Sequence, residues 1–228
     1  MDNEHADEVL EVWDWEKVNP TGQGVPRKEA HSLGIPHEGV HLWIARNVKG
    51  PEVLFQKRAA SKDMFPDCLD ITVAGHVPLG ITENKIQKEA MEEIGISPLD
   101  SDMTDLGWFR YEEVTDKIFH RELQHIYLLL DNRDLARYSF NDGEVDAIYA
   151  VPLDIFEAMI ENDVKFYAEG FDGQSGFTKT LYREDFHPLL FAPSMKEYVS
   201  ILIRALKELT STGTVTARMP LRRGESGS

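Results

Sequence analysis

Three glutamates are spaced so that they can act together on one helix. Glu89, Glu92 and Glu93 stand at i, i+3 and i+4, which places them on one face of an α-helix. Like charges this close repel one another in water, so the spacing favours a cation between them. Hard divalent ions such as Mg²⁺ and Mn²⁺ suit carboxylate oxygens and keep positions for water and substrate phosphate. The alternative is a solvated acidic helix face.

The neighbouring face of the same predicted helix is apolar. This face carries Ile86, Ala90 and Ile94, and their spacing predicts that the helix packs against a core. A loop with Gly75 and Gly80 precedes the helix, and the apolar run 69–73 before that loop predicts a strand. The order strand, glycine loop, acidic helix therefore positions the three glutamates beside a turn of exposed backbone.

This order carries a known pattern. Residues 88–96 resemble the second half of the Nudix box, Arg-Glu-apolar-x-Glu-Glu-x-Gly-apolar, and Gly75 resembles its opening glycine. The resemblance implies a loop–helix–loop that binds metal ions and, through them, a diphosphate. It implies that Glu89, Glu92, Glu93 and the carbonyl of Gly75 hold Mg²⁺ or Mn²⁺. Glu89 would then orient or deprotonate the attacking water.

The box also departs from the family pattern at three places. Lys88 stands where the family has Arg, the span from Gly75 to Lys88 is one residue shorter, and Ile81 occupies the place of an expected Glu. These departures leave open the number of metal ions and the level of activity.

The resemblance extends over about residues 8–160. Segments 26–31, 37–44 and 56–58 are similar, in the same order, to the Nudix subgroup related to isopentenyl-diphosphate isomerase. Those isomerases carry a catalytic cysteine directly before the Gly-His of the loop, where this chain has Ala74. The single cysteine of the chain, Cys68, lies six residues earlier. We therefore expect hydrolysis rather than isomerisation.

Four residues outside the acidic helix are further candidates. Glu122 begins a predicted strand and matches a position where the isomerase-like subgroup carries a metal-linked or catalytic glutamate. Lys57 and Arg58 end a strand and can bind a diphosphate through charge-assisted hydrogen bonds. His76 flanks the glycine loop and is a candidate substrate ligand. The alternatives are a surface glutamate and solvated strand-end cations.

Two more histidines precede the box. His41 lies within an apolar strand, where a core histidine is expected, and His37 flanks a loop, where a ligand role stays open.

Charge and composition limit the class of partner. The 228 residues include 24 Lys+Arg against 40 Asp+Glu, a net charge of -16. Such a field repels nucleic acid and anionic membranes, and a phosphorylated substrate would need metal to neutralise it. The acidic N-terminus lacks the order of a signal peptide, and no apolar run approaches the roughly 20 residues of a membrane span. We expect a cytoplasmic protein.

Helix- and strand-like segments alternate irregularly, which predicts an α+β fold. The resemblance makes this a Nudix-type α/β/α sandwich with a mixed sheet and an extra C-terminal helix. We expect an N-terminal strand and short helix packing on the core (residues 1–35) and a Nudix domain (36–162). A C-terminal extension with a helix (163–209) and a disordered tail (210–228) would follow.

The expected function is metal-dependent hydrolysis of a diphosphate linkage in a small substrate, either a nucleoside di- or triphosphate or a thiamine-type diphosphate. One alternative is an isomerase of isopentenyl diphosphate. The other is a binding module that keeps the Nudix fold without catalysis, which the shortened loop and Ile81 favour. The sequence leaves the oligomeric state open, a homodimer included.

Overall fold

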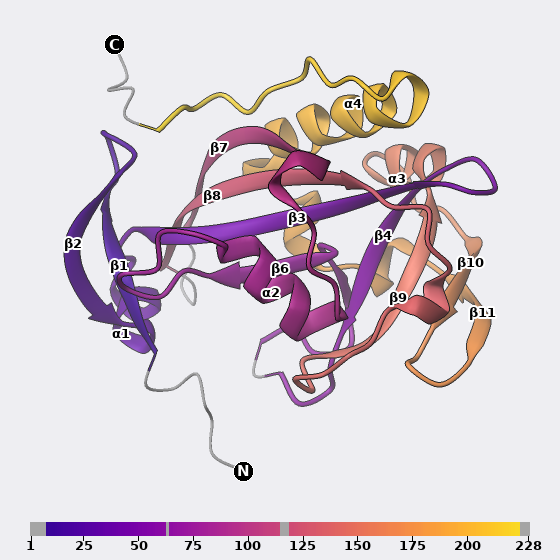
Figure 1. Cartoon of the computed structure of the whole chain (residues 1–228), viewed down its shortest axis with the longest axis horizontal. Coiled ribbons are helices and arrows are strands. Elements are labelled where there is room, and N and C mark those ends of the chain that lie inside the picture. Colours follow the sequence, from indigo (N-terminus) through magenta and orange to yellow (C-terminus); the bar gives the residue numbers. More distant parts are fainter. Residues whose placement is uncertain (1–7, 63, 115–118, 224–228) are drawn as a thin grey trace.

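One central strand, β3 (His37–Asn47), organises the sheet. The structure is a computed structural model that describes residues 8–62, 64–114 and 119–223. β3 is buried at every position from His37 to Arg46, because helices cover both faces of the sheet at this strand (Figure 1).

β3 has different partners along its two edges. One edge pairs in parallel with β8 (Phe119–Leu130), beginning with His37 opposite Glu122. The other edge pairs antiparallel with β4 (Pro51–Arg58) at one end and with β6 (Val73–His76) at the other. β4 and β6 therefore diverge, and the second edge of β6 has no strand beside it in the described part of the chain. This mixture of parallel and antiparallel pairs confirms the mixed sheet.

The remaining strands extend the sheet on both sides. Its order among the described residues is β11-β10-β9-β4-β3-β1-β2, with β5 on β4 and β7 on β8. Their bounds are β1 Val9–Asp14, β2 Asn19–Pro26, β5 Leu69–Asp70, β7 Met103–Val114, β9 Val145–Pro152, β10 Phe166–Phe171 and β11 Gly176–Leu181.

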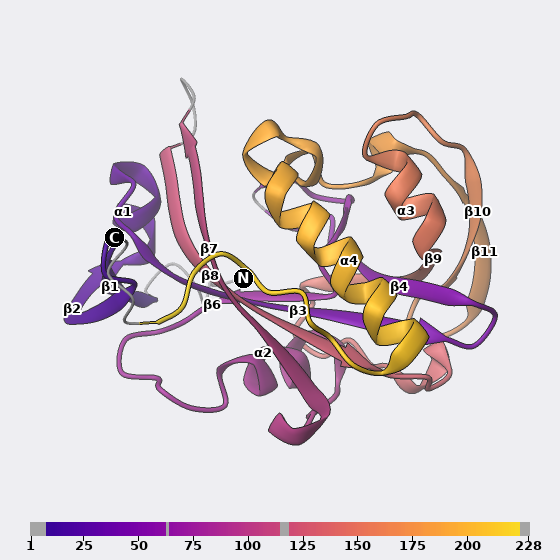
Figure 2. The same cartoon turned by 90° about the horizontal axis from the view of Figure 1, so that it is seen from above.

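Helices cover the two faces of this sheet, as the expected α/β/α sandwich requires. Figure 2 shows α2 on one side of β3 and β8, and α3 and α4 on the other. α1 lies at the end of the sheet, against β1, β2 and β8. The helices are α1 Arg27–Leu33, α2 Lys85–Ile94, α3 Leu153–Met159 and α4 Lys196–Thr212. None of the helices in the described residues is long and apolar enough to cross a bilayer.

Alternate residues of β3 face different helices, because side chains alternate along a strand. Trp43 packs in the core cluster that contains α4, and Leu42 packs in the cluster that contains Ile86 of α2. By the same alternation His37, Gly39 and His41 lie on the α4 face. The two faces of β3 therefore carry different chemistry.

The predicted strand over 69–73 is broken in the structure. Residues 69–70 pair with β4 as β5, whereas residues 73–76 pair with β3 as β6. Thr72 lies between them, where its hydroxyl donates to the carbonyl of Leu54 and accepts from the amide of Ile44. The chain crosses there from one diverging strand to the other.

The end of the chain differs from the expected disordered tail. α4 runs to Thr212, and the chain then follows β7, with hydrogen bonds between the backbones of Trp108 and Leu221 and of Leu106 and Met219. Every second residue is apolar, and the buried ones are Val215, Ala217 and Met219. This period-two pattern is typical of an edge strand, and the polar composition masked it. The first seven and last five residues of the expected terminal segments lie outside the described residues.

Candidate functional site

α2 distributes its three glutamates over different environments. Glu93 is 4% exposed and faces the sheet, Glu89 is half-buried, and the side chain of Glu92 is 46% exposed. Lys88 lies over the outer pair, with its Nζ 2.7 Å from Glu92 and 3.4 Å from Glu89. The helix ends at Gly95, whose φ of 70° favours glycine and whose amide donates back to Ala90.

Glu93 is tied to the place where β4 and β6 diverge. Its Oε2 accepts from Nε2 of Gln56 on β4 at 3.3 Å and from the amide of Ala74 on β6 at 3.2 Å. Burial raises the pKa of Glu93 well above its usual value, and the charges of Glu89 and Glu144 raise it further. A cation beside Glu93 would stabilise the ionised carboxylate and so lower its pKa.

Glu89 lies against the backbone of β6. A Cβ on Gly75 would stand 2.2 Å from Oε2 of Glu89, so the close approach requires glycine at this position. Burial raises the pKa of Glu89, although Lys88 lowers it. The structure thus brings Gly75, Glu89 and Glu93 together and leaves Glu92 at the solvent edge of the group.

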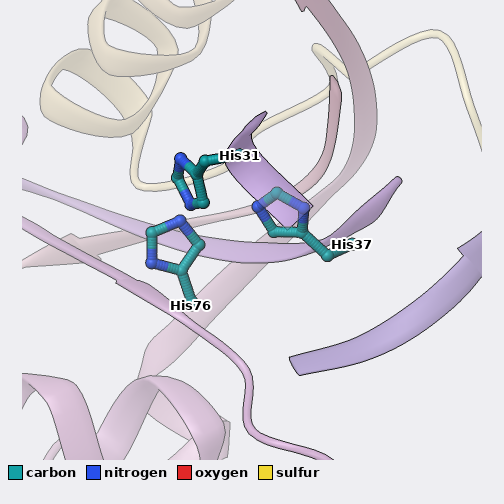
Figure 3. Close-up of side chains that lie close together, drawn as sticks. All are labelled: His31, His37 and His76. Atoms are coloured by element: carbon teal, nitrogen blue, oxygen red, sulfur yellow. The ribbon is translucent and has the colours of Figure 1, made fainter. Parts of the chain in front are cut away.

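A second cluster of ligand-type side chains lies on the opposite face of the sheet. Figure 3 shows the rings of His31, His37 and His76 converging from α1, β3 and β6. One ligand atom from each of the three lies within 4.8 Å of the others, and the same holds for His37, His120 and Glu122. We call these five residues the histidine cluster.

Two nitrogens of the histidine cluster have no hydrogen-bond partner among the described residues. Nε2 of His31 and Nε2 of His37 are buried without a hydrogen bond, although Nδ1 of His37 lies 2.8 Å from the carbonyl of Ile35. Burial lowers the pKa of His31 to about 4, with further lowering by His120 and His37. Burial also lowers the pKa of His37 and of His76. These imidazoles are therefore neutral at pH 7, the form that binds metals.

Glu122 is the anion of the cluster. Its Oε1 lies 3.6 Å from Nε2 of His76, its Oε2 lies 3.8 Å from Nε2 of His120, and Gln124 donates to Oε2 at 2.8 Å. Burial alone would raise its pKa, but the electrostatic influence of the nearby His120, His76 and His41 rings holds the pKa well below the usual range. Neutral imidazoles, an ionised carboxylate and unpartnered ring nitrogens fit a first-row transition metal.

The glutamates and the histidine cluster meet at consecutive residues of β6. Gly75 lies opposite Val40 on the α2 face, and His76 lies opposite Gly39 on the α4 face. Strand alternation therefore sends one residue to each group. β6 therefore lies between the two groups.

Comparison with known proteins adds to this geometry. No family model matches the sequence. An uncharacterized Nudix hydrolase of Clostridium acetobutylicum is 29% identical over 209 residues, which cover 89% of this chain and 98% of that protein. Nudix hydrolase 3 of Arabidopsis thaliana is 30% identical over 152 residues, 64% of this chain and 20% of that protein. The chain is thus similar, over most of its length, to a protein named as a Nudix hydrolase.

One solved structure shares the fold. A crystal structure of a Deinococcus radiodurans protein has a TM-score of 0.50 and 20% identity, over 67% of this chain and 88% of that one. We call α2 the Nudix helix, because it carries the residues that resemble the Nudix box, and Gly75 resembles the opening glycine of that box. The narrower resemblance to the isomerase-like subgroup stays a prediction.

Within this Nudix fold, two candidate substrate residues are already paired. Nζ of Lys57 lies 2.8 Å from Asp67 and 3.5 Å from Asp146. Arg58 lies 3.3 Å from Asp70 and donates to the carbonyls of Met64 and Phe65. These contacts brace the segment between β4 and β5. A diphosphate would have to compete with them.

The other two candidates lie in the histidine cluster. His76 and Glu122 lie together on the α4 face, whereas the glutamates of the Nudix helix lie on the α2 face. Sequence reasoning did not predict a role for His31 or His120. The signal was weak, because these histidines come from segments far apart in the chain and meet only through the parallel pairing of β3 with β8.

Proposed function

We propose that the protein is a metal-dependent hydrolase that cleaves a diphosphate linkage in a small phosphorylated molecule. The observation that carries the proposal is the convergence of Glu89 and Glu93 on the backbone of Ala74 and Gly75, beside the unpaired edge of β6. The names of the relatives, Nudix hydrolases, support the same class of reaction. A small-molecule diphosphate is therefore the proposed partner.

The side chains of the Nudix helix would have different roles in binding the metal ion and activating water. Glu92, Glu93 and the carbonyl of Gly75 suit Mg²⁺ or Mn²⁺, with Glu89 close enough to join them. A bound ion supplies positive charge that offsets the oxygens of the diphosphate. Glu89 has a raised pKa through burial, so it can accept a proton from the attacking water closer to neutral pH. Lys88, between Glu89 and Glu92, limits the repulsion that the acids would otherwise feel.

We infer that the histidine cluster holds a separate transition-metal ion. The buried, unpartnered Nε2 atoms of His31 and His37 are the observation behind this inference, because buried polar atoms are normally satisfied. His76, His120 and Glu122 complete the set of ligands. Glu122 would then act as a ligand on the α4 face, and a direct role in proton transfer is the alternative.

The isomerase alternative lacks its proton-transferring group. Ala74 offers no titratable side chain, and Cys68 cannot replace a reactive thiol because burial raises its pKa to about 12. Its Sγ also lies 3.1 Å from the carbonyl of Phe65 and so is engaged locally.

The test is a panel of diphosphates with Mg²⁺ or Mn²⁺, read as release of phosphate or pyrophosphate. Nucleoside di- and triphosphates and thiamine diphosphate belong in the panel. We expect metal-dependent turnover that Glu93→Gln abolishes. Binding of a diphosphate without any turnover would instead support the non-catalytic module. The cytoplasmic location and a homodimer stay predictions.

A further inference from the structure

His41 belongs to neither of the two groups described above. It is 6% exposed, lies on the α4 face of β3 and stands directly opposite Ala74 of β6. Opposed residues in a sheet have Cβ atoms about 4.5–5.5 Å apart. Ala74 is the residue whose amide reaches Glu93, and it is itself half-buried.

Hydrogen bonds fix the tautomer of His41. Nε1 of Trp43 lies 2.8 Å from the hydroxyl oxygen of Tyr198 and can only donate, so that oxygen accepts. The hydroxyl of Tyr198 must then place its own proton, and Nδ1 of His41 lies 2.9 Å away. Nδ1 is therefore the acceptor and Nε2 carries the hydrogen of the neutral ring.

The remaining hydrogen-bond donor of the His41 ring is its Nε2–H group. Within the described residues it has no hydrogen-bond partner, whereas Trp43 donates to the hydroxyl oxygen of Tyr198 and that hydroxyl donates to Nδ1 of His41. The residue is 6% exposed, and Nε2 is not among the fully buried atoms of the described residues that lack a partner, so a ligand oxygen or water can reach it. The strongest charges acting on the ring are the carboxylates of Glu122 and Asp70. A neutral acceptor suits this environment better than a phosphate.

We propose that His41 donates from Nε2 to a hydroxyl oxygen on the group that the diphosphate carries, and that Tyr198 is the residue that positions it. The inference rests on the proposed function, because the diphosphate must lie at the Nudix helix for its attached group to reach over Ala74. It narrows the substrate class. A sugar-bearing diphosphate such as a nucleoside diphosphate fits, whereas thiamine diphosphate lacks a free hydroxyl on its linked group.

The test compares substrates that differ only in hydroxyl groups. Binding and, where it occurs, kcat/KM are measured for ADP and for 2′,3′-dideoxy-ADP with Mg²⁺, in the parent and in His41→Phe. We expect the parent to prefer ADP by about 10-fold and His41→Phe to lose that preference. His41→Gln, whose amide nitrogen can donate from nearly the same place, should recover part of it.

Tyr198→Phe tests the positioning role. It should lower the preference for ADP several-fold and change the nitrogen NMR signals of His41, because Nδ1 loses its donor. Tyr149→Phe is the matched control: Tyr149 is similarly buried on β9, and its hydroxyl has no hydrogen bond in the described part of the chain. That variant should leave both the preference and the NMR signals of His41 unchanged.

Inorganic pyrophosphate separates failure of this inference from failure of the proposed function. Pyrophosphate binding without any preference for hydroxyl groups, or a preference that persists in His41→Phe, overturns the role of His41 and leaves the hydrolase intact. A His41-dependent preference in binding without turnover refutes the hydrolase and supports the inference. If neither pyrophosphate nor ADP binds with Mg²⁺, the proposed hydrolase function and the role of His41 are both refuted.

Discussion

The carboxylate of Glu122 occupies the space that a side chain on Gly39 would need: a Cβ on Gly39 would lie 2.4 Å from Oε1 of Glu122. The two residues belong to the parallel strands β8 and β3. Glycine at this position therefore lets a charged carboxylate lie flat against the sheet, within reach of His76 and His120.

Gly39→Ala should push Glu122 out of the histidine cluster. We expect Zn²⁺ binding to weaken by at least 10-fold, because a carboxylate ligand is displaced and the ion loses the anionic ligand that would offset its charge. Metal content after dialysis checks the result. Gly176→Ala is the control, since the nearest atom to a Cβ there is 3.9 Å away. Unchanged Zn²⁺ binding in Gly39→Ala would show that Glu122 is not a ligand.

Glu89→Gln should reduce kcat by ~10²–10⁴-fold, the usual effect of removing a positioned general base. The protein should fold normally, because Gln and Glu have similar helix propensities. Calorimetric titration should still show Mg²⁺ or Mn²⁺ binding. Glu161→Gln, an exposed substitution away from the Nudix helix, is the control. A kcat within about threefold of the parent would make Glu89 a bystander.

The stability of the metal-free protein should depend on Glu93 and on pH. Because the pKa of Glu93 is raised by burial, the native state favours the protonated form. Its stabilising contribution is full below the pKa of the unfolded chain and is lost as pH rises through the folded pKa. In EDTA, the Tm of Glu93→Gln relative to the Tm of the parent should therefore rise between pH 5 and pH 8.

Added Mg²⁺ should reverse this difference. An ion bound beside Glu93 raises the Tm of the parent by linkage and leaves Glu93→Gln unaffected. Equal metal-induced shifts in the two proteins would place the ion elsewhere.

No deuterium from heavy water should enter isopentenyl diphosphate. Ala74 replaces the proton-transferring cysteine, and the raised pKa of Cys68 leaves almost no thiolate at neutral pH. Mass spectrometry of the recovered diphosphate checks this expectation, with a boiled sample as the blank. Metal-dependent exchange above that blank would restore the isomerase.

Met219→Ala should destabilise the fold by about 2–5 kcal/mol, the usual range for deleting a buried methionine side chain. Met219 is 3% exposed and pairs through its backbone with Leu106 of β7. Urea denaturation would measure the change. Thr214→Ala, at an exposed position of the same segment, should change stability by less than about 0.5 kcal/mol. Equal effects would mean that the segment does not support the core.

Local patterns predicted several elements of this fold. The stripe of Ile86, Ala90 and Ile94 lies on the core-facing side of the Nudix helix, as its 3.6-residue period indicates. Gly34 ends α1 in a left-handed conformation, as a glycine after a short helix suggests. These features depend on neighbours in sequence, so the sequence contains them directly.

The site was predicted only in part, because half of it depends on pairing between distant segments. The glycine loop and the three glutamates are contiguous, and the structure brings Gly75, Glu89 and Glu93 together. The histidine cluster depends on the register of β3 against β8 and of β6 against β3. A shift of one residue in either register would turn these side chains to the other face. No local period reports that register.

The parallel pairing of β3 with β8 also has a consequence for how the chain folds. A parallel pair cannot close through a tight turn, and here β4, β6, α2 and β7 all intervene in sequence. Bringing His37 next to Glu122 closes a long loop, and this costs conformational entropy before the contact forms. We therefore expect the contact to form late in folding. A transition metal captured by the histidine cluster would therefore report that β3, β6 and β8 have paired.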